Sequence, residues 1–147
     1  MSSVFFTVIS GVLVFVIAQI LLRLWLDPIT ELKKTIGRVA QALTERADIY
    51  SNPGWPPNSL IEETRSHFRQ IMSELEANAS SIPFYSVTAR IFGLPSQESI
   101  YKSSKWLNGI SNSLWKNDLF DKNIAKAQLI KDALGIYTPE NERIDIE

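Results

Sequence analysis

The feature that most constrains this chain is an uncharged, strongly apolar run near its amino end. Nineteen residues from Val4 to Leu22 carry no charge and are mainly Val, Ile, Leu and Phe. Extended through Leu26, the run is roughly 35 Å long as a helix, enough to cross a hydrocarbon layer of about 30 Å. A helix that is apolar on every face needs lipid or protein all round it. The run therefore predicts one transmembrane helix over residues 1–26.

A buried core helix and a cleaved signal peptide are the two competing interpretations of this run. A domain this small can hardly surround an all-apolar helix with protein. A signal peptide requires a basic start, a shorter apolar region and a small-residue cleavage site. Residues 1–3 carry no side-chain charge, and the segment Leu24-Trp25-Leu26-Asp27 is a poor cleavage site. An uncleaved membrane anchor is therefore favoured.

The basic residues around the span predict its orientation. Arg23, Lys33, Lys34 and Arg38 follow the apolar run, and no Lys or Arg precedes it. Because such cations stay on the cytoplasmic side, we expect the N-terminus outside and the remaining chain in the cytoplasm. Arg23 and Trp25 are candidate interfacial anchors. Lys33, Lys34 and Arg38 are candidate headgroup contacts, or ordinary orientation charges.

A narrow stripe of small residues follows one face of the predicted span. At 100° per residue, Thr7, Gly11 and Ala18 fall within about 40° of one another, and Ser10 lies beside them. Such a stripe allows close helix approach, although small residues are common in membrane helices. We treat it as a candidate packing face for a homo-oligomer or a membrane protein partner.

The rest of the chain, residues 27–137, is predicted to be an all-α domain. Asp27-Pro28 is typical of a helix start, and a hinge is expected there. Apolar residues then recur with 3-4 spacing to about residue 49, and a turn-rich loop follows over residues 51–58. Ser59 and Glu62 match a capping box, and a second stripe continues to about Ala79. Two such stripes predict an antiparallel helical hairpin over about 28–80.

Three shorter helices are expected after the hairpin, forming a small helical bundle over about 84–134. Pro83 and the segment 93–95 bound a short apolar helix, a second helix covers about 96–114, and a third covers about 121–134. Gly135 followed by Ile136 is typical of a glycine-ended helix. Residues 138–147 are polar and acidic and are predicted to be a disordered tail.

The composition excludes several kinds of chemistry. A net charge of −1 and the lack of a basic stripe argue against nucleic-acid binding, and a chain without cysteine has no thiolate metal site or thiol nucleophile. Glu63 and His67 are four residues apart, but Arg65 and Arg69 are interleaved with them, which is typical of a solvated helix face. We predict no catalytic residues, no metal site, no cofactor and no enzymatic activity.

The tryptophans of the domain are either core or partner sites. Core is the favoured interpretation for Trp106, whereas both stay open for Trp55, in its proline-rich loop, and for Trp115.

Residues 23–75 resemble a HAMP signalling linker, in which a membrane span feeds a parallel two-helix unit. The resemblance rests on Arg23, Pro28, Ile29 and Leu32, then a loop, and then Phe68, Ile71 and Leu75. It implies signal relay from the membrane.

The whole chain also resembles a group of small, single-pass bacterial membrane proteins with no assigned activity. The segments that carry this resemblance are Ile9-Ser10-Gly11-Val12-Leu13-Val14-Phe15, Asp27-Pro28-Ile29, Asn52-Pro53-Gly54, Thr88-Ala89-Arg90-Ile91-Phe92-Gly93-Leu94-Pro95, Ser111-Asn112-Ser113 and Leu134-Gly135-Ile136-Tyr137. The resemblance implies a bacterial plasma (inner) membrane.

These observations together predict a membrane-anchored interaction, scaffolding or regulatory module. The alternatives are a membrane-perturbing effector whose spans oligomerise, and the HAMP-like relay.

Overall fold

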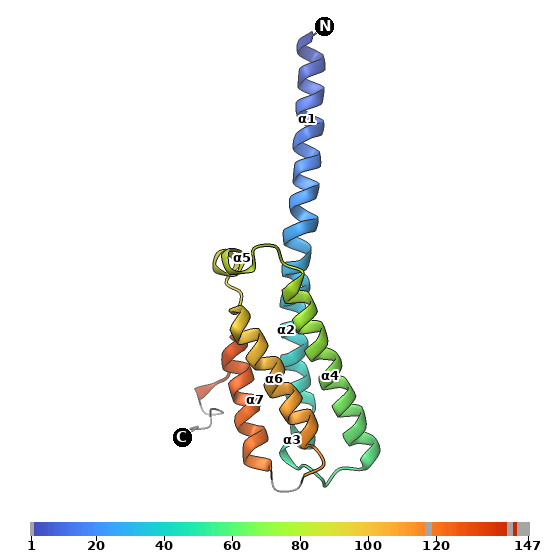
Figure 1. Ribbon diagram of the computed structural model, residues 1–147, viewed down its shortest axis with the longest axis vertical. Helices are drawn as coiled ribbons and strands as arrows, with labels where there is room; N and C mark the ends of the chain where they lie inside the picture. Colours follow the sequence, from blue (N-terminus) through green and yellow to red (C-terminus); the bar gives the residue numbers. More distant parts are fainter. Residues whose placement is uncertain (1, 117–118, 141–142, 144–147) are drawn as a thin grey trace.

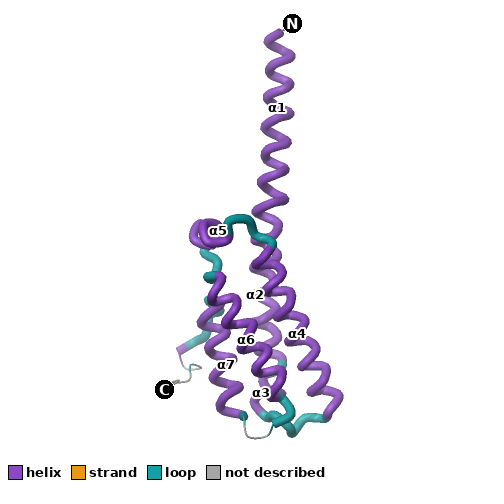
Figure 2. The backbone as a smooth tube through the Cα atoms, viewed as in Figure 1, coloured by secondary structure: helices purple, strands orange, loops and turns teal. Residues whose placement is uncertain are grey.

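The computed structural model describes residues 2–116, 119–140 and 143, and in these residues it contains helices and loops but no strand (Figure 2). The amino-terminal helix projects from a group of helices that lie together at its carboxyl end (Figure 1). The helices are α1 (Ser2–Leu21), η1 (Leu22–Leu26), α2 (Asp27–Glu45), α3 (Ala47–Ser51), α4 (Asn58–Ser80), α5 (Tyr85–Phe92), α6 (Gln97–Ser113) and α7 (Phe120–Leu134). The all-helical prediction is confirmed for this part of the chain.

The predicted hinge at Asp27-Pro28 is wrong, because the helix continues through this point. Asp27 is itself helical, and its backbone N–H bonds the carbonyl of Leu22, five residues back, so η1 is one wide π-helical turn. Proline lacks an N–H and crowds the carbonyl four residues before it, which a wider turn relieves. The Thr30 hydroxyl also donates to the Leu26 carbonyl at 2.8 Å. The proline thus widens the helix without breaking it.

Polar contacts show that α4 runs antiparallel to α2. Thr35 on α2 accepts a hydrogen bond from Asn78 at 2.8 Å, and Arg38 pairs with Glu74 at 2.7 Å. Just after α2, Arg46 pairs with Glu63 at 2.6 Å. Residues that come later in α2 therefore contact residues that come earlier in α4, as antiparallel helices do.

The apolar stripes found in the sequence form the core between these helices. Ile29, Leu32, Val39 and Leu43 of α2 are at most 3 % exposed, and Phe68 of α4 is fully buried. The other buried residues of α4 are Ile61, Thr64, Ile71, Leu75 and Ala79. Helix α6 packs on α4, and α7 packs on α6 and α3. Trp106, which was predicted to be a core residue, is half-buried and packs against this core.

Buried Asn123 on α7 ties three helices together. Its amide nitrogen donates to the Tyr50 carbonyl at 3.2 Å, and its amide oxygen lies 2.5 Å from the Ser113 hydroxyl. Buried polar atoms are costly unless they are bonded, so these contacts fix α7 against α3 and α6.

The helix ends agree with the sequence in some places and differ in others. Gly93 and Gly135 have left-handed backbones, as the glycine-ended helices require. The capping box at Ser59 is wrong, because α4 already begins at Asn58, after Pro57, and has no side-chain cap. Thr138 is buried and Arg143 lies 3.2 Å from Asp132, so these parts of the predicted tail contact the domain. Residues 141–142 and 144–147 of the tail lie outside the described part.

Candidate membrane-contact surface

The surface of α1 is uncharged and mainly apolar, and it lies outside the core. Among the described residues, one helix is long and apolar enough to cross a membrane, and its apolar window is 0 % buried. Its side chains, such as Phe5, Leu13, Phe15 and Ile17, are more than half exposed. Exposed apolar area of this extent is unusual for a monomer in water. It offers nothing to a polar ligand and fits lipid tails or apolar protein.

The two predicted anchors differ in their surroundings. Arg23 is exposed on η1, whereas Trp25 is half-buried and packs against the core. Trp25 therefore joins the apolar surface of α1 to the domain, while the Arg23 guanidinium is free to reach a polar layer.

Two of the three candidate headgroup cations are ion-paired within the protein. The Lys34 ammonium lies 2.8 Å from Glu31, and Arg38 binds Glu74 and the Thr35 hydroxyl. The hydrogen bond from Lys34, followed by its charge, lowers the pKa of Glu31. Lys33 is exposed and makes no ion pair with the described residues. Lys33 and Arg23 are therefore the better candidates for anionic headgroups.

The small-residue stripe of Thr7, Ser10, Gly11 and Ala18 lies on a regular α-helix, so its members share one face. A Cβ atom added at Gly11 would meet nothing within 4 Å. The Ser10 hydroxyl donates to the Phe6 carbonyl within the helix, which satisfies its proton without a partner helix. The stripe is thus open to a partner helix at Gly11.

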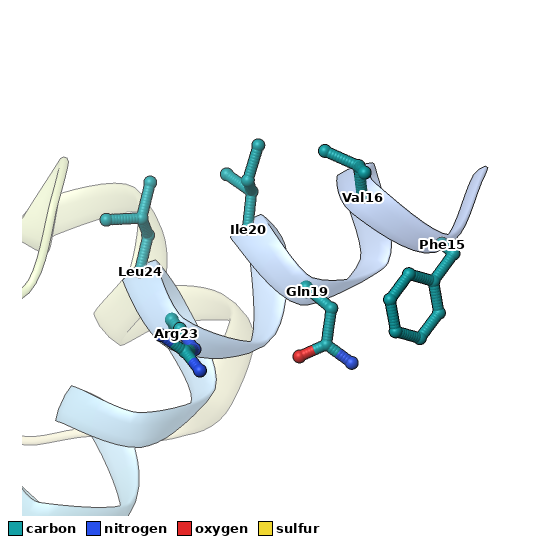
Figure 3. A pocket seen from close by; sticks show the side chains of 6 residues that line it. All are labelled: Phe15, Val16, Gln19, Ile20, Arg23 and Leu24. Carbon is teal, nitrogen blue, oxygen red and sulfur yellow. The ribbon is translucent and has the colours of Figure 1, made fainter. Parts of the chain in front are cut away.

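A shallow pocket of about 620 Å³ lies along the last turns of α1. Figure 3 shows that all its side chains come from one stretch of helix, with Gln19 and Arg23 on one side and Val16, Ile20 and Leu24 on the other. Because a single helix cannot enclose a ligand, this is a surface hollow rather than a binding site.

A larger apolar groove of about 840 Å³ separates the end of α1 from α5. One wall comes from α1 and η1 and consists of Ala18, Leu21, Leu22, Trp25 and Leu26. The other wall comes from α5 and its N-cap and consists of Phe84, Val87, Thr88, Ile91 and Phe92. The sequence predicted the α5 helix but gave no sign of this groove, because apolar residues lie on both sides of α5.

The inner side of α5 is buried, and local hydrogen bonds hold the loop that follows it. Tyr85, Thr88 and Ala89 are at most 8 % exposed, and the Tyr85 hydroxyl donates to the Pro95 carbonyl at 2.8 Å. Leu94 N–H donates to the Ala89 carbonyl across the left-handed Gly93. Its outer side is different, because Phe84, Val87 and Ile91 are 78 %, 61 % and 70 % exposed.

Phe84 has a strained backbone. It is the one non-glycine with positive φ in the described residues, at φ 49° and ψ 48°. This left-handed conformation costs an L-residue with a side chain about 1–2 kcal/mol. Because the ring is exposed, its packing offsets little of that strain energy.

We expect Phe84→Gly to be more stable than Phe84→Ala by about 1 kcal/mol, because glycine adopts the left-handed region without strain. Thermal unfolding in detergent micelles measures the difference. Val87, on the regular turn of α5, is the matched position, and there glycine should be less stable than alanine by about 0.5–1 kcal/mol. If glycine were less stable than alanine at both positions, the result would contradict backbone strain at Phe84.

At the far end of the domain from α1, Trp55, Trp115 and Phe120 are 85 %, 44 % and 45 % exposed, and we name this group the distal aromatic surface. Gly54 N–H donates to the Leu114 carbonyl at 2.8 Å, which brings the two tryptophan segments together. Large exposed aromatic side chains are typical of protein-binding sites.

The polar residues weighed for chemistry form no site in the described part of the chain. Glu63 binds Arg46 rather than His67, and no group of three His, Asp or Glu side chains has the spacing for a metal ion there.

Comparison with protein-family models, with curated proteins and with solved structures finds no match to this chain.

Proposed function

We propose that this protein is a membrane-anchored helical interaction module: α1 crosses the membrane, and the helical domain (residues 27–137) binds other proteins beside it. The observation that carries the proposal is the uncharged and mainly apolar surface of α1, which no other part of the described chain covers.

The energetics favour insertion of α1. Fourteen of the nineteen residues from Val4 to Leu22 are Val, Ile, Leu or Phe. Each contributes about 0.3–0.6 kcal/mol at a helix centre, so together they supply roughly 4–8 kcal/mol in favour of the bilayer. The α1 backbone bonds itself internally, as a spanning segment must.

The orientation follows from the cations that succeed the span. With Arg23 and Lys33 on the domain side, the N-terminus lies outside and the domain lies in the cytoplasm. The resemblance to single-pass bacterial proteins supports a plasma (inner) membrane as the location.

The lack of cysteine makes a direct test of this topology possible. Ser3→Cys should react with a membrane-impermeant maleimide in intact cells, whereas Ser73→Cys, exposed on α4, should react only after lysis. The reverse pattern would refute the orientation. Equal labelling of both sites in sealed right-side-out vesicles would refute the span.

The distal aromatic surface supports the interaction part of the proposal. It is carried on the end of the domain that points away from α1, where the bilayer does not hide it (Figure 1). Trp55→Ala should leave folding intact and reduce capture of a partner from native membranes. The buried helices then serve to hold that surface at a fixed distance from the anchor.

We expect Gly11→Leu to weaken self-association of the protein in membranes by about tenfold, because the added side chain holds two helices apart at the stripe. Crosslinking in native membranes measures the dimer fraction. Val16→Leu adds one methylene on the opposite face of α1 and should leave it unchanged. Equal crosslinking of wild type and Gly11→Leu would show that the stripe is not used.

The two alternative functions receive less support. A HAMP linker requires parallel helices, whereas α4 runs antiparallel to α2. Charged residues commonly line the pore of an ion-conducting effector, and Val4 to Leu22 carries no charge.

A further inference from the structure

We infer that α5 is a second membrane contact: its outer face lies among lipid acyl chains, and a lipid tail occupies the groove between α5 and the end of α1. This inference rests on the proposed function, since it requires α1 to be in the bilayer.

The position of α5 is the first argument. It lies beside η1, at the end of the domain nearest α1, and Figure 1 views it end-on while α1 runs lengthwise. Its axis therefore crosses that of α1, and a helix that crosses a membrane span in this way lies along the bilayer plane. Interfacial amphipathic helices have this orientation.

The chemistry of its outer face is the second argument. Phe84, Val87 and Ile91 are exposed on one side, whereas the inner side is already buried in the domain. Residues 81–95 carry a single charge, Arg90, which is exposed. An apolar face flanked by one cation suits the boundary between acyl chains and anionic headgroups.

Continuity with α1 identifies the occupant of the groove as lipid. The opposite wall, from Ala18 to Leu26, is part of the apolar surface that the proposed function places in hydrocarbon. A tail lying against Leu21 and Leu22 is therefore also against Val87 and Ile91. Without a lipid tail, the groove of about 840 Å³ would hold water against its apolar walls. Contact between water and apolar surface is unfavourable.

Site-directed spin labelling tests the inference in the full-length protein, reconstituted in vesicles of phosphatidylethanolamine and phosphatidylglycerol. Three single-cysteine variants are compared: Val87→Cys on the outer face of α5, Ser86→Cys as its exposed neighbour outside the groove, and Val16→Cys within α1. Oxygen partitions into lipid and a nickel chelate stays in water, so the two collision rates report the surroundings of each label. Circular dichroism verifies that each variant is folded.

We expect the labels at Val87 and Val16 to collide mainly with oxygen, and the label at Ser86 to collide several-fold more with the nickel chelate. Nickel access at Val87 with oxygen access at Val16 would overturn this inference and leave the proposed function standing. A label at Val87 that neither reagent reaches would overturn it in favour of a second copy or a protein partner. Oxygen access at Ser86 as well would overturn the proposed flat orientation. Nickel access at Val16 would overturn the proposed function itself.

Discussion

The double variant Leu13→Arg, Ile17→Arg is expected to lose membrane integration. Both side chains are 56 % exposed on α1, near the middle of the span. Each exchange costs roughly 3–4 kcal/mol at a helix centre, so the pair removes about as much free energy as the apolar run supplies. The fraction of protein that stays in the membrane pellet after alkaline carbonate extraction should fall from nearly all to below about a tenth.

The matched control for this loss is Leu13→Ile, Ile17→Leu, which exchanges two apolar side chains and should remain in the pellet. The helical domain should resist protease equally in both variants, because α1 does not contact the core. A double-arginine variant that stays in the pellet as completely as its control would contradict the insertion of α1.

Phe68→Ala is expected to destabilise the helical domain by about 3–5 kcal/mol, the usual cost of removing a large buried aromatic ring. Phe68 is fully buried on α4, and its ring lies 6.4 Å from that of Tyr50 on α3. For a domain of this size the midpoint of thermal unfolding should fall by roughly 10–20 °C. Near-ultraviolet circular dichroism in detergent micelles follows the transition.

Phe84→Ala is the control for this loss, because it removes the same ring from a position that is 78 % exposed. Its stability should stay within about 1 kcal/mol of wild type. Equal losses in the two variants would mean that Phe68 is not a core residue.

The sequence predicted the helices well wherever a single periodic stripe faced one core. Ile61, Phe68 and Leu75 recur at helical spacing, and all are buried, because burial of an amphipathic face determines where such a helix packs. The helix ends at Gly93 and Gly135 were also predicted, since a left-handed residue at a helix end favours glycine.

The errors arose where tertiary structure overrides a local rule. Pro28 suggested a break, but a π-helical turn accommodates the proline, which has no N–H. No pattern in the sequence predicts that turn. Ser59 has the spacing of a cap, but Pro57 starts the helix earlier.

The α1–α5 groove could not be predicted for a similar reason. Tyr85 and Ala89 point inward while Val87 and Ile91 point outward, and all are apolar or aromatic. Periodicity alone does not tell which side of such a helix is buried; the low exposure of Tyr85 and Ala89 in the folded chain does.

Cell-free synthesis of the full-length chain, with and without liposomes, tests the central claim most directly. With liposomes, the protein should float with the vesicles in a density gradient and resist carbonate extraction. Without lipid or detergent, it should aggregate, because the surface of α1 has nothing to cover it. A soluble monomer in the lipid-free reaction, seen by sedimentation velocity, would contradict membrane anchoring through α1.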